Sequence, residues 1–176
     1  GGINGHRFRH ALKDDGYRTA ETLRLSRELI HKDKAAALIG YAGTGNILEL
    51  LRQGVLAEGN IALVAPYTGG EPLRDPYNPW IFHIRASYGD ETTAMVTQLV
   101  NTGLQRIAVF HQDDPFGQAG LAGVAKALAH PRLNPVSTGR YAKNSEDVSG
   151  SVADNAPGEP QAVILIGAVT PPPAFV

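Results

Sequence analysis

The chain has 176 residues, of which 43% are hydrophobic and 19% charged, a composition typical of a globular protein with a buried core. Sixteen basic residues against seventeen acidic ones leave a net charge of −1 without a basic stripe, which argues against a nucleic-acid partner. The absence of cysteine excludes disulfides, a thiol nucleophile and cysteine-ligated metals, and no apolar run is long enough to span a bilayer.

Short apolar runs alternate with amphipathic stretches along the chain, as strands and helices do. In chain order we predict strand 6–13, helix 19–32, strand 35–39, helix 46–58, strand 61–65, a Pro/Gly-rich loop 66–80, strand 80–85, helix 89–102, strand 106–110, helix 116–129, strand 135–141, a weak helix 145–155 and strand 162–166.

This order predicts an α/β fold, because parallel strands need helix-length connections. We expect two Rossmann-like lobes with parallel sheets flanked by helices: residues 1–85 in the first and 86–176 in the second, with a hinge crossover near 80–88. Both ends are expected to be cut. The segment 1–5 reads as a turn without the marks of a signal peptide, and prolines 171–173 stand where a helix should follow strand 162–166.

Two glycine-containing loops follow strands that we expect to be neighbours, where ligands of open parallel sheets bind. The first contains Thr44 and Gly45, whose hydroxyl and exposed N–H groups favour an anion such as a carboxylate. An equally plausible interpretation is that Thr44 or Asn46 only caps the helix. The second loop contains Tyr67, Thr68 and Gly69, and by itself it reads equally well as a simple turn.

A third loop, His111-Gln112-Asp113-Asp114-Pro115-Phe116-Gly117, follows strand 106–110. Asp113 or Asp114 is expected to cap the next helix, with Pro115 in its first turn. Capping is favoured over metal binding because no histidine at ligand spacing accompanies the carboxylates. Phe116 offers a ring face to a ligand or packs inward.

Several enzyme signatures are missing from the sequence. There is no G-x-S-x-G elbow, no phosphate-binding G-x-x-x-x-G-K-[ST] loop and no H-E-x-x-H pair, and Leu48 stands where a dinucleotide fingerprint needs its third glycine. We therefore predict no catalytic residue, no metal site, no cofactor and no enzyme activity.

Seven stretches spread along nearly the whole chain carry a family resemblance: Gly1-Gly2-Ile3-Asn4-Gly5, Asp14-Asp15-Gly16-Tyr17, Leu38-Ile39-Gly40 with Thr44, Pro66-Tyr67-Thr68-Gly69, Phe82-His83-Ile84-Arg85-Ala86-Ser87-Tyr88, Arg106-Ile107-Ala108-Val109-Phe110 and Asp113-Asp114-Pro115-Phe116-Gly117. In this order they resemble the branched-chain amino-acid (Leu/Ile/Val) family of ABC-transporter solute-binding proteins, which has the type I periplasmic-binding-protein fold.

The resemblance implies two lobes that trap a ligand between them. It implies that Thr44 and Gly45 bind the ligand carboxylate, that the loop Tyr67-Thr68-Gly69 offers a carbonyl to the ammonium and further donors to the carboxylate, and that Phe116 covers the ligand. The family's opening strand would precede Gly1, and the acidic residue that meets the ammonium would follow Val176. Val169 replaces a frequent aromatic, which leaves room for a different or bulkier ligand.

The sequence therefore predicts a periplasmic or extracellular protein that captures an amino acid or similar carboxylate and delivers it to the membrane permease of an ABC importer. The signal peptide would lie outside these residues. One alternative keeps the fold in the sensing domain of a signalling receptor. A second is a nucleotide- or sugar-phosphate-using α/β enzyme, and a module that binds no ligand ranks last.

Overall fold

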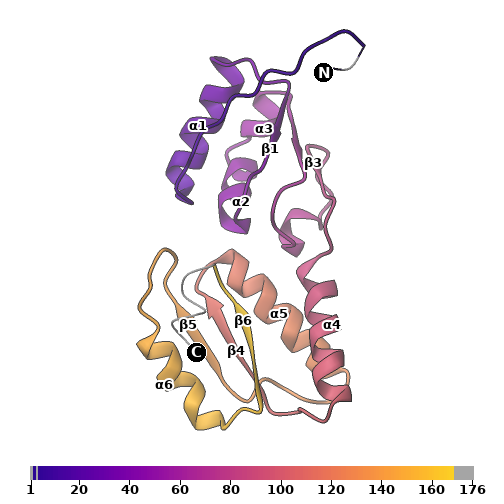
Figure 1. Cartoon of the computed structure of the whole chain (residues 1–176), viewed down its shortest axis with the longest axis vertical. Coiled ribbons are helices and arrows are strands. Elements are labelled where there is room, and N and C mark those ends of the chain that lie inside the picture. The colour runs from indigo at the N-terminus through magenta and orange to yellow at the C-terminus, as the bar shows by residue number, and fades with distance from the viewer. Residues whose placement is uncertain (1, 3, 169–176) are drawn as a thin grey trace.

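The computed structural model describes residue 2 and residues 4–168, which form two three-stranded parallel sheets with helices packed on them. Figure 1 shows the sheet of the N-terminal half above that of the C-terminal half along the long axis. Residues 83–87 carry the chain from one half to the other. The α/β class with parallel sheets and flanking helices is thus confirmed.

The N-terminal half contains α1 (Thr19–His31), β1 (Ala37–Ile39), α2 (Thr44–Arg52), α3 (Val55–Glu58), β2 (Ala62–Val64), the 3₁₀ turn η1 (Glu71–Leu73) and β3 (Ile81–Phe82). Its strand order is β1-β2-β3, and the register places Leu38 beside Leu63 and Leu63 beside Ile81. These three side chains form one core with buried residues of α1, α2 and α3.

The opposite face of this sheet is exposed in the part of the chain that the structure describes. Ile39 retains 59% and Phe82 52% of their accessible surface, whereas Leu63 retains none. Alternating side chains of a strand point to opposite faces, so the described helices cover only one face here.

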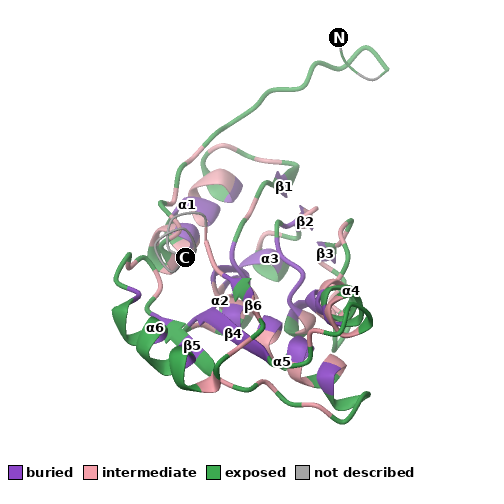
Figure 2. Ribbon diagram, turned by 60° about the horizontal axis from the view of Figure 1, so that its bottom comes forward, coloured by how far each residue is buried: buried purple, intermediate pink, exposed green. Residues whose placement is uncertain are grey.

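The C-terminal half contains α4 (Tyr88–Asn101), β4 (Ile107–Gln112), α5 (Pro115–Ala129), β5 (Thr138–Tyr141), α6 (Ser149–Asn155), the 3₁₀ turn η2 (Ala156–Gly158) and β6 (Ala162–Ile166). The strand order is β5-β4-β6. The central strand β4 is buried along its whole length (Figure 2). Ile107 and Val109 pack with α4 and α5 on one face, and Phe110 packs with Tyr141 and Val148 on the other.

The predicted strand 6–13 is wrong, because residues 7–13 form no strand. A segment becomes a strand only by pairing with a neighbour, and here the side chains turn to the end of α1 instead. Lys13 Nζ donates to Glu28 Oε1 at 2.9 Å, and Arg9 Nη2 donates to the Asp33 carbonyl at 2.8 Å.

Other element boundaries shift for local reasons. The predicted helix 46–58 begins at Thr44 and is divided in two at Gly54, whose φ of 67° is left-handed. The predicted strand 80–85 shortens to β3, and Ile84 beyond it is 80% exposed.

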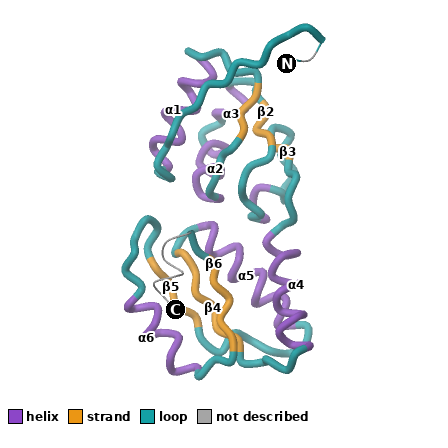
Figure 3. The backbone as a smooth tube through the Cα atoms, in the orientation of Figure 1, coloured by secondary structure: helices purple, strands orange, loops and turns teal. Residues whose placement is uncertain are grey.

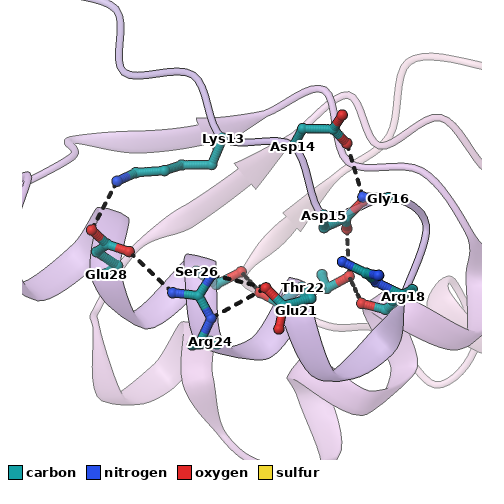
Figure 4. Close-up of polar contacts among 10 residues, drawn as sticks. All are labelled: Lys13, Asp14, Asp15, Gly16, Arg18, Glu21, Thr22, Arg24, Ser26 and Glu28. Carbon is teal, nitrogen blue, oxygen red and sulfur yellow. Dashed lines mark hydrogen bonds and ion pairs between the residues drawn. The ribbon is translucent and has the colours of Figure 1, made fainter.

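A tight turn leads into α1 and directs Tyr17 toward the carboxyl end of β1. Asp14 accepts a hydrogen bond from Gly16 N at 2.8 Å (Figure 4), and Asp15 accepts one from Tyr17 N at 2.9 Å. The Tyr17 ring then packs on Gly43, where a Cβ would lie only 2.6 Å from Tyr17 Cε2. Only glycine fits beneath this ring.

We expect Leu63→Ala to lower the free energy of unfolding by about 2–5 kcal/mol, because it opens a cavity at a side chain that is fully buried. Ile39→Ala in the neighbouring strand is the matched control and should cost about 1 kcal/mol or less, since most of that side chain is exposed. Urea unfolding of both variants measures this. Equal losses would mean that the second face of the sheet is covered as well.

Candidate functional site

The N-terminus of α2 brings two predicted loops together through a buried pair of hydroxyls. Thr44 and Thr68 are both fully buried, and their Oγ1 atoms lie 2.7 Å apart. Thr68 Oγ1 also accepts a hydrogen bond from Gly70 N at 3.1 Å. No side chain caps α2, whose N-cap is Gly43, so the alternative in which Thr44 or Asn46 serves as a cap is not what the structure adopts.

Backbone pairing beyond the strands aligns these loops. Ala42 and Tyr67 form a parallel bridge, and Tyr67 N donates to the Tyr41 carbonyl at 2.7 Å. This pairing extends the β1–β2 register past both carboxyl ends. The two loops therefore share one edge of the sheet, as their positions after neighbouring strands predicted.

Two glycines of the second loop are held by close approach. A Cβ at Gly69 would lie 2.8 Å from Tyr88 N, which donates to the Gly69 carbonyl at 2.8 Å. A Cβ at Gly70 would lie 2.6 Å from Thr44 Cγ2. The loop is thus packed against both Thr44 and the start of α4.

The third loop faces the first from the C-terminal half. Asp114 caps α5 by accepting from Phe116 N at 2.9 Å and Gly117 N at 3.1 Å, with Pro115 as the first helical residue, as the sequence predicted. A Cβ at Gly45 would lie 3.3 Å from Pro115 Cδ. The N-termini of α2 and α5 therefore meet where the two halves face each other (Figure 3).

Tyr67 and Phe116 line a hollow of about 220 Å³ together with residues that the sequence analysis did not single out as site residues. The Arg85 guanidinium lies 5.2 Å from the ring centroid of Tyr67 and 5.5 Å from that of Tyr88. Tyr88 in turn contacts Phe116, with centroids 5.4 Å apart. Arg85 also forms an ion pair with Glu91. The hollow thus has aromatic walls and a neutralised charged pair.

Thr44, Gly45, Thr68 and Gly69 do not line this hollow. A larger hollow of about 680 Å³ runs between η1 and the outer side of α5 and includes none of the predicted site residues. The smaller hollow is the better candidate because two predicted loops from different halves converge on it.

A polar network connects Tyr17 to β4. Gln112 Nε2 donates to Tyr17 Oη at 3.3 Å and to Asp114 Oδ2 at 2.8 Å, while Tyr141 Oη donates to Gln112 Oε1 at 3.1 Å. Burial raises the pKa of Tyr17 to about 12, so its hydroxyl stays neutral at physiological pH.

Sequence reasoning missed Arg85, Tyr88, Tyr17 and Gln112 as site residues. Arg85 and Tyr88 follow β3 and not one of the glycine-rich loops, while Tyr17 stands in a turn far away in sequence. A charged residue at the end of the predicted strand 80–85 is the one local signal for Arg85.

Residue 2 and residues 4–168 contain no group of three histidine, aspartate or glutamate side chains that could hold a metal ion. No helix within these same ranges is both long and apolar enough to cross a membrane.

We expect Gly70→Ala to cost about 1–3 kcal/mol in unfolding free energy, because the new methyl group would press on Thr44 Cγ2. Thr44→Ser removes that Cγ2 and keeps the hydroxyl, so the cost should fall sharply in the double variant. A double-mutant cycle by urea unfolding measures the coupling. Gly150→Ala, where a Cβ meets nothing within 4 Å, is the control; the same cost in both Thr44 backgrounds would contradict the contact.

The fold is similar to that of a solved structure along the whole chain. A crystal structure of a substrate-binding periplasmic protein from Ralstonia solanacearum is 35% identical with a TM-score of 0.95, and the alignment covers 100% of this chain and 49% of that one. None of the curated proteins compared with the chain matches it.

Two more distant structures share the fold. The solute-binding protein of an ABC transporter from R. palustris, solved in complex with benzoate, is 20% identical, with a TM-score of 0.82 over 93% of this chain and 45% of that one. A branched-chain amino-acid ABC transporter protein from Thermus thermophilus with bound valine is 22% identical, with a TM-score of 0.78 over 93% and 42%.

The chain thus spans about half the length of these three structures. The family model described as periplasmic binding protein matches residues 1–176, from the first residue to the last. The chain therefore belongs to the periplasmic binding protein family, which is a family of binding proteins and not of enzymes.

Proposed function

We propose that this chain is part of a periplasmic solute-binding protein that holds a small carboxylate between two lobes and delivers it to the permease of an ABC importer. Residues 1–85 would form one lobe and 86–176 the other, with the hinge near 80–88. The observation that carries the proposal is the buried pair of Thr44 and Thr68 hydroxyls at the start of α2.

The start of α2 suits a carboxylate. Unpaired N–H groups and the helix dipole give a helix N-terminus partial positive charge, and no side chain caps this end of α2 with a hydrogen bond. On the facing helix, the Asp114 carboxylate is already engaged by Phe116 N, Gly117 N and Gln112. Because the Asp114 carboxylate already occupies the N-terminus of α5, the N-terminus of α2 is the better site for an additional anion.

The Thr44–Thr68 bond gives the site a ligand-free resting arrangement. A buried hydroxyl without a partner costs about 1–3 kcal/mol, so two hydroxyls that bind each other avoid that cost when no ligand is present. A carboxylate can replace this bond by accepting a hydrogen bond from each threonine. Because both side chains are fully buried, the ligand enters only after the lobes open, and closure then removes water from the polar contacts.

The rest of the ligand would lie against the aromatic hollow. Tyr67, Tyr88 and Phe116 present ring surfaces there, which suits an aliphatic or aromatic group. Valine and benzoate, bound by the two more distant relatives, share one carboxylate joined to an apolar group. An amino acid such as valine is one member of this class, and an aromatic acid is another.

A thermal-shift screen tests the ligand class. We expect one or more carboxylates of the set valine, leucine and benzoate to raise the melting temperature, and valinamide, leucinamide and benzamide to have no effect. A ligand at a hundredfold excess over its Kd stabilises the folded state by about 2.7 kcal/mol. Stabilisation by the amides as strong as by the acids would refute carboxylate recognition.

A second test addresses Thr44 directly. Thr44→Ala removes a hydrogen bond to a charged group, worth about 1.5–3 kcal/mol, so the best carboxylate of the screen should bind roughly ten- to a hundredfold more weakly. Thr44→Ser keeps the hydroxyl and should bind within a few-fold of the parent. Isothermal titration calorimetry measures both, and unchanged affinity of Thr44→Ala would remove Thr44 from the site.

A further inference from the structure

Lys143 reaches from the C-terminal half to two residues of the N-terminal half. It lies in the loop between β5 and α6. Its ammonium donates to Asn46 Oδ1 at 2.6 Å and lies 4.1 Å from the centroid of the Tyr17 ring. A charge-assisted hydrogen bond and a cation–π contact thus join the two halves at one side chain.

Asn46 is a firmly held acceptor for this bond. It is fully buried in α2, and its Oδ1 also accepts from the Thr19 hydroxyl at 2.9 Å. Its Nδ2 donates to Thr22 Oγ1 at 3.1 Å. These bonds to α1 fix the amide, so Lys143 meets an acceptor that is already oriented.

Tyr17 is held equally well. Its ring packs on Gly43, and its hydroxyl accepts from Gln112 of the C-terminal half. The ring therefore presents a fixed face to the ammonium. Tyr17 itself contributes a second hydrogen bond between the halves.

The environment of the Lys143 ammonium depends on contact between the two halves. Burial lowers the pKa of Lys143, while the negative charges of Asp114 and Asp15 act in the opposite direction. A partly desolvated ammonium is unfavourable unless polar partners replace its water. The Asn46 oxygen and the Tyr17 ring are those partners, and both belong to the other half.

We propose that Lys143 is a latch that holds the two halves closed without any ligand, through its contacts with Asn46 and Tyr17. It is a positioning residue and needs no contact with the bound solute. The effect of the latch on affinity rests on the proposed function, whereas its effect on closure does not. A ligand that binds the closed form alone gains apparent affinity in proportion to the fraction of closed molecules.

Distance measurements by pulsed electron–electron double resonance on ligand-free protein test the latch. The 176 residues contain no cysteine, so spin labels at A57C in α3 and A153C in α6, both at exposed positions, report the separation of the halves. We expect Lys143→Met to lower the ratio of closed to open molecules by about tenfold, as for the loss of one charge-assisted hydrogen bond, and to add a longer distance to the distribution.

Two further variants serve as controls for the loss of the Lys143 contacts. Lys143→Arg keeps a cation and donors and should retain the parental distances. Lys126→Met removes an exposed lysine of α5 outside these contacts and should do the same. Parental distances in Lys143→Met, or an equal shift in Lys126→Met, would overturn the proposal; circular dichroism and thermal melting verify that each variant is folded.

Calorimetry with the best carboxylate of the screen provides the second arm. Lys143→Met should weaken binding by up to the factor by which its closed fraction falls. Full parental affinity despite measurable opening would overturn its role in binding. If no carboxylate binds even the parent protein, the proposed function fails, while the ligand-free distances still decide whether Lys143 closes the halves.

Discussion

The hydrogen bond between Thr44 and Thr68 is the constraint around which the candidate site is built. It requires the loops that follow β1 and β2 to lie side by side at the same position along the sheet, and the Ala42–Tyr67 bridge keeps them in that register. It also requires a glycine at position 70, because any side chain there would displace Thr44. This single buried contact thus depends on the parallel pairing, on the loop register and on one close approach. A change at any of these positions should therefore affect it.

The segment between the halves is held by charged side chains and not by sheet pairing. Arg74 Nη2 donates to the carbonyls of Arg85 and Ala86 at 2.8 and 3.2 Å, and the Arg85 guanidinium is in cation–π contact with Tyr67 and Tyr88. Because β3 ends at Phe82, these contacts take over where backbone pairing stops. A guanidinium in cation–π contact can move across an aromatic face without breaking a strand ladder, which suits a segment that we propose to be a hinge.

Sequence reasoning was accurate where a pattern is local. The Asp114 cap and Pro115 follow from helix-start chemistry, and the meeting of Thr44 with Thr68 follows from adjacent parallel strands. It failed for the strand predicted at 6–13, because pairing depends on a neighbour that the segment itself does not encode. It also missed Lys143 and Tyr17, which lie 126 residues apart in sequence and meet only in the folded chain. Contacts between the halves leave no periodic signal.

The contacts between the halves differ in chemistry on the two sides of the α2–α5 junction. The Lys143 bond to Asn46 is short and directional, and it is lost as soon as the halves separate. On the other side, Arg85 lies in cation–π contact with Tyr67 and Tyr88, and Tyr88 meets Phe116 at a tilted angle, so the contacts around the hollow are less directional than a hydrogen bond. A molecule closed by directional hydrogen bonds at Lys143 and Tyr17 and by an aromatic surface around the hollow can accept ligands of different size while keeping the same closed arrangement at Lys143. The combination of directional and less directional contacts suits a binding protein whose ligands share a carboxylate and differ in the group attached to it.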